Sequence, residues 1–488
     1  MTCAIELGYS KTDLNFLSQP PPETSGAGIV LNLLSHRLLL LSLLVGSSVA
    51  PLFAQAADLV TITPTLNVLA GARDLEKARR WEDAAQAYLK VWVADRANTD
   101  AHEGVLRCLR SCFQSTRHRD PALLAQIHAM TPAEVLALYS EVITKIQAYY
   151  VDPERASPLR LFRQGLDEFL AALGEPTFIE RYLKGVDPSA IAKFRANIQK
   201  AWLGRDVQTP RIAVELVAEI ATASRRTLGL RTIHPVVAEF ICGACNSLDE
   251  YSAYLSGIQF TSDSKGGPLD RSVDVRLHDG DVVLLKVSHF HQSTPQEIEE
   301  ALKPIQMARQ IRALILDLRG NTGGSLMAAI KTAEKFLPGG IIVSAQGPHD
   351  EVNKVYTSIS GPAALEFPMI VLVDGETASA AEVLAIALRD NRRAKLIGTA
   401  TFGKGTVQNV VKFTTAEEID PKTGQATPRA AIRITLARLI GPSGAQITGI
   451  GATPNEVVMD RFRQDEVAMD QARELARRYV PGMSMMRQ

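Results

Sequence analysis

The chain has 488 residues, of which 46% are hydrophobic and 22% charged, and its 53 basic side chains balance 53 acidic ones. This length is ample for two or three globular domains, and the even charge gives no reason to expect a general affinity for nucleic acid or acidic surfaces. The one short basic stretch, RSCFQSTRHRD, is typical of a solvated loop, so we expect no nucleic-acid partner.

The first segment has the features of an export signal. SHRLLLLSLLVGSSVAPLFAQAAD contains a His-Arg pair, an apolar run and then the small residues Ala-Gln-Ala, which end at Ala56. The alternative is an uncleaved membrane-spanning helix, but Gly46 and Pro51 interrupt the apolar run, which is short for a span. We therefore predict that residues 1–56 are a leader and signal peptide, and that the mature chain is exported, to the periplasm or outside the cell.

Cys3 would be lost with the leader, and four cysteines would remain: Cys108, Cys112, Cys242 and Cys245. In an exported chain these four could form disulfides in three different pairings. The C-x-x-C spacing also resembles half of a zinc site or a redox pair, but the other two cysteines are distant in sequence and differently spaced. We expect buried or disulfide-bonded cysteines and no metal site.

Residues 57–125 are predicted to form a helical hairpin. Small and large side chains alternate there at helical spacing, which suits two helices in close antiparallel contact. Trp81, Ala84 and Tyr88 match the second-helix pattern of a tetratricopeptide repeat. Stable arrays of this repeat need about three units, and barely more than one is present. We expect a cap on the rest of the chain, with a protein-binding surface as the further possibility.

Residues 126–262 are predicted to be mainly helical. Thr131, Pro132 and Glu134 fit the N-cap, N1 and N3 positions of a helix. Four further segments with helical patterns follow: LRLFRQGLDEFLAAL, SAIAKFRANIQKAWL, RIAVELVAEIATASRR and PVVAEFICGACNSL.

From residue 263 to 460, strand and helix patterns alternate. SVDVRLHDGDVVLLKVSHF indicates a hairpin that turns at Asp279-Gly280. The buried strands ALILDL, MIVLVD and AKLIGT alternate with the helices SLMAAIKTAEKFL and SAAEVLAIALRD, which implies right-handed crossovers and a parallel sheet. After Val407 the pattern becomes rich in strands, and residues 461–488 contain an amphipathic terminal helix.

Ser379 lies in ETASAAE, between a strand and a helix. Functional groups of parallel sheets gather at the carboxyl ends of strands, and a helix N-terminus offers outward backbone N–H groups. A hydroxyl at this junction can act as a nucleophile towards a carbonyl, and its small neighbours would let a polypeptide approach closely. The alternative is that Thr377 or Ser379 merely caps the helix.

A serine nucleophile needs a base. The histidine nearest in sequence, His349, belongs to a polar loop, and the candidate base is Lys404 in TFGKGTVQ. A lysine acts as a base near neutral pH only when burial keeps it uncharged. Gly403 and Gly405 permit the close backbone packing that such burial needs. The alternative is an ordinary solvated lysine.

GTATFGKGT also nearly matches the phosphate-binding loop G-x-x-x-x-G-K-[ST]. However, Gly405 stands where the hydroxyl residue should follow the lysine and displaces that hydroxyl to Thr406. The next residues, TVQNVVKF, are strand-like, so no helix N-terminus would face a phosphate. We therefore expect no nucleotide and no other cofactor.

Together the two stretches resemble the carboxyl-terminal processing, or tail-specific, serine proteases. TASAAEVLAIALRDNRRAKLIGTATFGKGTVQ keeps the motifs of that family and their spacing. The resemblance implies that Ser379 is the nucleophile, Lys404 its general base and Gln408 the residue that orients the lysine. It also implies supporting roles for Glu382, Asp390 and Thr401.

A third motif adds an oxyanion hole to this resemblance. LILDLRGNTGGSL contains Arg319 as a further supporting residue and ends in a glycine turn. An amide of this turn would join the amide of Ala380 in stabilising a developing oxyanion, and Gly323 and Gly324 are both candidates.

Two flanking segments, LDEYSAYL and LARLIGPSGAQITGIGATPNEVV, resemble those that precede and close the protease core, with Asn455 in place of the usual aspartate. The PDZ domain that family members usually carry is missing, because Leu255 and Val282 are too close in sequence to enclose one. Recognition of substrate tails by strand addition is therefore not implied.

The resemblance implies an α/β, crotonase-like (ClpP-like) protease core preceded by an all-α N-terminal region. We predict an exported serine endopeptidase that cleaves polypeptides through a Ser-Lys dyad and an acyl-enzyme, without metal. The alternatives are a non-catalytic ligand-binding protein on the same fold and a scaffold that works through its N-terminal helices.

Overall fold

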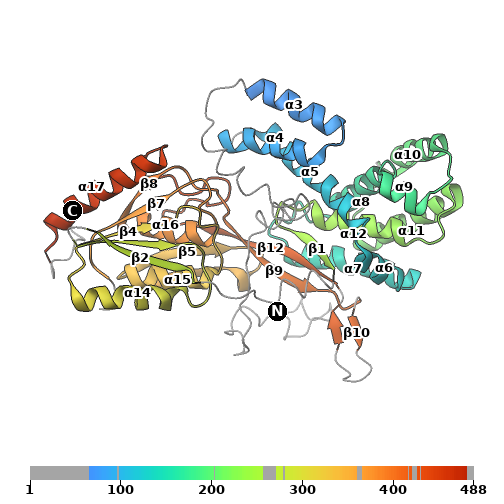
Figure 1. Ribbon diagram of the computed structural model, residues 1–488. Helices are drawn as coiled ribbons and strands as arrows, with labels where there is room; N and C mark the ends of the chain where they lie inside the picture. Colours follow the sequence, from blue (N-terminus) through green and yellow to red (C-terminus); the bar gives the residue numbers. More distant parts are fainter. Residues whose placement is uncertain are drawn as a thin grey trace. The chain divides into compact units, whose positions relative to one another are not determined.

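A computed structural model describes residues 65–95, 98–202, 204–256, 271–278, 281–359, 365–415, 417–419, 426–428 and 430–480 (Figure 1). The predicted leader and signal peptide and the predicted Asp279-Gly280 turn lie outside the described residues. The chain divides into two compact units. The sheet unit contains Ser262–Val407 and Leu436–Gln488, and the helical unit contains Leu33–Thr261 and Gln408–Thr435.

The sheet unit is built on six strands in the order β13-β8-β7-β4-β3-β2. All neighbours are parallel except β2, which pairs antiparallel with β3 as the predicted hairpin. The strands are β2 (Val273–His278), β3 (Val282–Val287), β4 (Ala313–Asp317), β7 (Met369–Val373), β8 (Ala394–Gly398) and β13 (Glu456–Val457). The alternation of strands and helices in the sequence thus correctly predicted a parallel sheet.

Helices cover both faces of this sheet (Figure 1). On one face lie α14 (Thr294–Ala308), α15 (Leu326–Phe336) and α16 (Ala380–Asp390), and on the other lies α17 (Arg461–Arg478). The central strand β7 is buried along its whole length, because successive side chains point to opposite faces and both faces are covered. Ile370 and Leu372 join the cluster with α17, whereas Val371 joins the cluster with α16.

Two further strands of the sheet unit carry no clear sequence signal. β5 (Gly340–Gln346) pairs antiparallel with β6 (Lys354–Ser358) and with Arg438–Ile440 at the end of β12 (Ala430–Ile440). A short 3-10 helix, η2 (Asp350–Val352), joins β5 to β6. β6 exposes most of its side chains, so its sequence lacks the apolar alternation of a half-buried strand.

The helical unit begins with three consecutive helices, α3 (Thr65–Lys77), α4 (Trp81–Ala94) and α5 (Thr99–Arg117). Small-against-large packing joins them, since a Cβ added at Gly104 would lie 2.6 Å from the buried Tyr88 ring. The helices that follow are α6 (Pro121–His128), α7 (Pro132–Tyr149), α8 (Pro158–Ala172), α9 (Pro176–Tyr182), α10 (Pro188–Trp202), α11 (Pro210–Leu228) and α12 (His234–Asn246).

The predicted start of α7 is confirmed in detail. Thr131 Oγ1 accepts the N–H of Glu134, and the Glu134 carboxylate accepts the N–H of Thr131, so both halves of a capping box are present. Pro132 occupies the first turn, where a missing N–H costs nothing.

The segment Gln408–Thr435 returns to the helical unit, although the sequence analysis assigned it to a continuous core at 263–460. It comprises most of β9 (Thr406–Lys412), then β10 (Glu417–Ile419) and β11 (Ala426–Pro428), which pair with each other, and the start of β12. β12 pairs there with β1 (Ala253–Ser256), and Phe413 stacks on Tyr254. These long-range contacts leave no local pattern in the sequence.

The four described cysteines, Cys108, Cys112, Cys242 and Cys245, are free thiols, so the predicted disulfide alternative does not apply to them. Burial raises the pKa of Cys242 to about 12, which keeps its thiol protonated. Among the helices in the described part of the chain, none combines the length and apolar character needed to cross a bilayer.

Candidate active site

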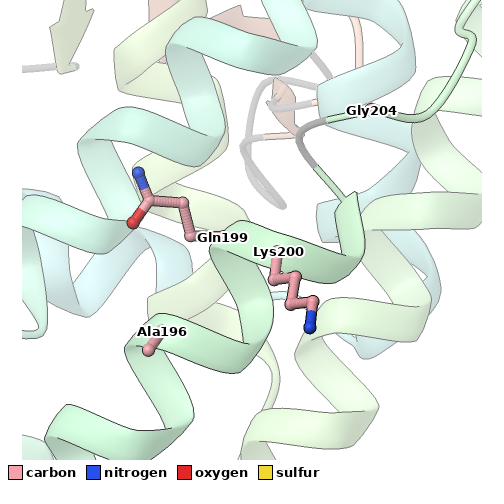
Figure 2. A pocket seen from close by; sticks show the side chains of 4 residues that line it. All are labelled: Ala196, Gln199, Lys200 and Gly204. Carbon is pink, nitrogen blue, oxygen red and sulfur yellow. The ribbon is translucent and has the colours of Figure 1, made fainter.

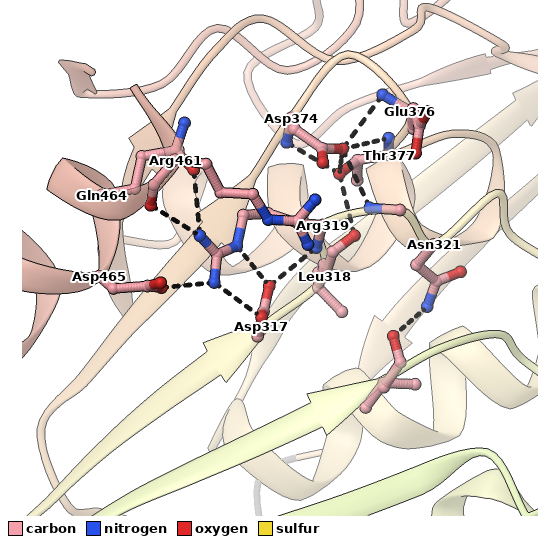
Figure 3. A network of polar contacts seen from close by, with 12 residues as sticks. Asp317, Leu318, Arg319, Asn321, Asp374, Glu376, Thr377, Arg461, Gln464 and Asp465 are labelled. Atoms are coloured by element: carbon pink, nitrogen blue, oxygen red, sulfur yellow. Dashed lines mark hydrogen bonds and ion pairs between the residues drawn. The ribbon is translucent and has the colours of Figure 1, made fainter. Parts of the chain in front are cut away.

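Three turns meet at the carboxyl ends of β4, β7 and β8. The turn after β4 accepts two hydrogen bonds from the turn after β7: Thr377 Oγ1 donates to Leu318 O (2.9 Å) and the Ala378 N–H to Asn321 O (2.9 Å) (Figure 3). The turn after β8 is joined in the same way, since the Phe402 N–H donates to Thr377 O (2.9 Å). Side chains distant in sequence are therefore brought together at one edge of the sheet, as parallel strands allow.

Ser379 occupies the sharp junction between β7 and α16. Its backbone has φ 56° and ψ −119°, a positive φ that non-glycine residues rarely adopt and that costs energy unless the surroundings enforce it. The residue is only partly buried, and the Ala380 N–H that follows belongs to the first helical turn, where N–H groups have no partner within the helix. This geometry presents a hydroxyl beside an available backbone donor.

Glu382 connects the serine to the lysine loop. Its carboxylate is completely buried, and Oε2 accepts the backbone N–H groups of both Ser379 and Lys404 at 2.8 Å. These two nitrogens therefore lie no further apart than twice that distance. The other oxygen, Oε1, accepts the Gly403 N–H and the Thr401 hydroxyl. Burial raises the pKa of Glu382, although the four hydrogen bonds oppose that shift.

Lys404 is held in a rigid and buried loop. Only 5% of the residue is exposed. Its two neighbours are bound through their carbonyl groups: Gly403 O accepts the Gly449 N–H (2.8 Å), and Gly405 O accepts the Thr448 hydroxyl (2.7 Å). Burial disfavours the charged form of an amine, so the condition that the sequence analysis set for a lysine base is met in this respect.

The glycine turn after β4 lies directly against the serine. A Cβ added at Gly323 would lie 2.8 Å from Ser379 Cβ and 3.1 Å from Ala380 N, so only glycine fits there. The Gly323 N–H donates to Asn321 Oδ1 (2.9 Å). Gly323 has φ 106° and Gly324 has φ 130°, values that glycine adopts without strain.

Phe290, which follows β3, holds this turn from the other side. Its N–H donates to Gly323 O (2.8 Å), and its carbonyl oxygen accepts the Ser325 N–H (2.7 Å). A Cβ at Gly324 would lie 2.0 Å from Phe290 O, which shows how closely the two backbones approach. The sequence analysis did not identify Phe290, although its position just beyond a predicted strand was a usable signal.

Arg319 and Asp390 support the turns from a distance. The Arg319 guanidinium, 5% exposed, binds Asp317 through two hydrogen bonds of 2.9 Å and Asp465 of α17 at 2.6 Å (Figure 3). Asp390 lies at the opposite end of α16 from Ser379, where it accepts the Ser443 N–H (3.2 Å). Both predicted supporting residues thus fix backbone rather than contact the serine hydroxyl.

Asp374 is a further residue that the sequence analysis missed. Its Oδ1 accepts the N–H groups of Gly320, Glu376 and Thr377, so it ties the turn after β4 to the turn that leads to Ser379 (Figure 3). It directly follows β7, and an acidic residue at the end of a buried strand could have been recognised as a turn-forming residue.

Gln408 belongs to the helical unit rather than to the sheet unit. Its Nε2 lies 3.4 Å from Thr435 Oγ1. Its predicted role in orienting the lysine stays a prediction.

Histidines are closer to the glycine turn than the sequence suggested. His349 is the nearest to Ser379 in sequence, but His289 and His291 flank Phe290, whose backbone binds Gly323. Their place at the end of β3 was not considered when the sequence was searched for a base.

A shallow depression elsewhere contains none of the predicted site residues. It lies in the helical unit and is lined by Ala196, Gln199, Lys200 and Gly204 (Figure 2). With one lysine and no acid or nucleophile, this lining offers no catalytic group.

Comparison with known proteins confirms the resemblance that the motifs predicted. Residues 281–458 match the sequence model of a family described as Peptidase family S41. The carboxy-terminal-processing protease of Bartonella bacilliformis is 38% identical over 183 residues, 37% of this chain and 39% of that protein. The carboxyl-terminal-processing protease of Synechocystis sp. is 35% identical over 177 residues, 36% of this chain and 37% of that protein.

The matched part of the chain thus covers less than two fifths of the length of these curated relatives. Among solved structures, the photosystem II D1 C-terminal processing protease aligns with 67% of this chain and 94% of its own, at 16% identity and a TM-score of 0.42, a likeness too weak to carry an argument.

Proposed function

Because residues 281–458 form a peptidase family S41 domain, we propose that this protein is a serine endopeptidase in which Ser379 is the nucleophile and Lys404 the general base. The observation that carries the proposal is the shared oxygen of Glu382, which accepts the backbone N–H groups of both residues. This contact brings a strained, partly exposed serine close to a buried lysine, and burial favours the uncharged amine that a base requires.

The reaction would proceed in two stages. In the first, the amine of Lys404 takes the hydroxyl proton of Ser379 while Oγ bonds to the carbonyl carbon of a peptide, whose oxygen becomes an oxyanion. The C–N bond then breaks, the lysine passes its proton to the leaving amine, and an acyl-enzyme remains. In the second stage Lys404 takes a proton from water, the resulting hydroxide attacks the ester carbonyl, and the proton returns to Ser379. The steps use no metal or other cofactor.

The oxyanion would be held by two backbone donors. The Ala380 N–H is one of them, because it lies next to the nucleophile at the N-terminus of α16. Of the two glycine candidates, Gly324 is favoured, because the Gly323 N–H already donates to Asn321 Oδ1.

The other predicted residues would act by holding these groups in place. Glu382 and Thr401 fix the lysine loop through their mutual hydrogen bond. Arg319 and Asp390 anchor the turn after β4 and the far end of α16, and Gln408 would orient the lysine amine.

We further propose a crotonase-like core, polypeptide substrates and export after cleavage near Ala56. The close match of this region to carboxyl-terminal processing proteases supports the substrate class. The segments 57–125, 126–262, 263–460 and 461–488 remain our proposed domain boundaries, with 57–125 as the candidate surface for a protein partner.

The test is covalent labelling with a fluorophosphonate probe, combined with mass spectrometry of a casein or tailed-peptide digest. We expect wild-type protein to be labelled on Ser379 and to release peptides, and Ser379→Ala and Lys404→Met to lose both properties. Ser443→Ala and Lys395→Met are matched controls, because both side chains are exposed in the same unit. Digestion that persists in Ser379→Ala would refute the assignment.

The same experiment separates the non-catalytic alternatives. A ligand-binding protein or a scaffold would show neither labelling nor cleavage in wild-type protein. Deletion of residues 57–120 provides the third comparison, since a scaffold that works through its N-terminal helices would lose its function while retaining any hydrolysis.

A further inference from the structure

The segment that follows β3 contains a buried polar cluster that the reaction does not use. His291 is 7% exposed, and its Nδ1 lies 2.7 Å from Ser293 Oγ. Its Nε2 lies 3.4 Å from Oε1 of Glu297, which belongs to α14. Ser293 Oγ also donates to the same carboxylate oxygen (3.0 Å). The imidazole is therefore fixed on both of its ring nitrogens.

Glu297 in turn is anchored to the start of the folded sheet unit. Its second oxygen, Oε2, accepts the N–H of Ser272 (2.8 Å) and its hydroxyl (2.9 Å). The His291 N–H donates to Thr294 Oγ1 (3.0 Å), so the backbone of the segment is also bound to the first turn of α14. This cluster ties the end of β3 to α14 at several points.

Phe290 lies directly beside this cluster. On one side its ring is buried in the sheet core, with 2% exposed. On the other side its neighbour is the fixed His291. Between these two anchors, the Phe290 backbone holds Gly323 and Ser325 through hydrogen bonds of 2.8 and 2.7 Å. A displacement of His291 would thus pass directly to the glycine turn, which already approaches Ser379 Cβ so closely that a side chain at Gly323 would not fit.

We propose that His291 and Glu297 are positioning residues that set the oxyanion-binding turn through the Phe290 backbone. The inference rests on the proposed function and adds residues to it that none of the resembling motifs contains. Neither side chain touches the substrate. Their effect follows from the tolerance of catalysis to geometry, since a misplacement of about 1 Å can cost roughly a hundredfold in rate.

The test compares His291→Leu, His291→Gln and Glu297→Gln with wild type. We measure kcat and KM on a cleaved peptide and Ki for a peptide aldehyde, whose adduct with the serine carries the charge that the turn would stabilise. For His291→Leu and Glu297→Gln we expect kcat to fall about tenfold and Ki to rise by a similar factor, with KM within about twofold. His291→Gln should recover part of the rate, because its amide nitrogen can reach Glu297.

His289→Gln is the matched control. It removes an imidazole from the other side of Phe290, where Nδ1 lies 3.0 Å from Ser288 Oγ, and should leave all three constants unchanged. Rates are divided by the folded fraction at the assay temperature, from a thermal melt. Wild-type kcat and Ki per folded molecule in His291→Leu and Glu297→Gln would overturn the proposal, as would an equal loss in His289→Gln. Cleavage by Ser379→Ala would instead remove the proposed function itself.

Discussion

Glu239 of the helical unit and Glu382 of the sheet unit are almost completely buried, yet their carboxyl pKa values shift in opposite directions. Burial raises the pKa in both cases. For Glu239, the charges of Arg117 and His118 outweigh burial and lower the pKa. The hydrogen bonds that Glu382 accepts come from neutral groups, one hydroxyl and three backbone amides, and there burial prevails.

The difference shows two uses of a buried carboxylate. Glu239 compensates cations and joins α12 to α5, with Arg117 Nη2 at 2.8 Å and His118 Nε2 at 2.9 Å. Glu382 gathers backbone N–H groups from two turns and so determines where Ser379 and Lys404 stand. Loss of the first should therefore reduce stability, and loss of the second should reduce activity.

The largest expected effect is on the stability of the helical unit. Glu239→Gln would leave Arg117 and His118 without their shared partner, and breaking a buried ion pair in this way typically costs about 3–5 kcal/mol. Urea unfolding followed by tryptophan fluorescence measures this unit specifically, because Trp81, Trp92 and Trp202 are the only three tryptophans of the chain and all belong to it.

Glu215→Gln is the control for that measurement, because Glu215 pairs with Arg211 on an exposed helix surface and should leave the unfolding midpoint unchanged. An unfolding free energy of Glu239→Gln equal to that of wild type would contradict the structural role given to Glu239. The kcat of this variant per folded molecule should stay within about twofold of wild type.

The next effect is on activity. Glu382→Gln replaces a carboxylate that accepts four hydrogen bonds by an amide whose NH2 group would face two of the same donors. We expect kcat/KM to fall about a hundredfold to a thousandfold, a loss of about 3–4 kcal/mol of transition-state stabilisation. Steady-state kinetics on the peptide of the proposed test measures it. Glu299→Gln, which changes an exposed carboxylate paired with Lys335, is the control, and equal activities in the two variants would remove Glu382 from the site.

The smallest effect is a difference in the pH dependence of stability. The pKa of Glu239 is lower in the folded chain than its ordinary value of 4.5, so its contribution is present above that pH and is lost as pH falls further. Between pH 5 and pH 3, wild-type protein should lose up to about 1.4 kcal/mol per pH unit more than Glu239→Gln.

Glu382 should contribute with the opposite sign. Its pKa is raised in the folded chain, so its contribution to stability is present at low pH and is lost as pH rises through the raised pKa. Urea midpoints of the two variants and wild type across the pH range give both slopes. Parallel curves for all three proteins would mean that neither carboxylate has the shift described.

Local patterns in the sequence predicted much of the fold. The capping box of α7 follows from residues three apart, and the buried strands β4 and β7 follow from continuous apolar runs. The candidate nucleophile and base were found in the same way, because TASAAE and TFGKGT are contiguous motifs. β6 was missed because an exposed edge strand has little hydrophobic alternation.

What the sequence determined by itself was which side chains can do chemistry and on which kind of element each one stands, because propensity, capping and burial patterns act between near neighbours. Only the tertiary structure decided that Glu382 binds the backbones of Ser379 and Lys404, and that Phe290 holds the glycine turn. Those contacts depend on strand order and on the register of parallel strands, which arise from packing across the sheet and leave no periodic signal along the chain.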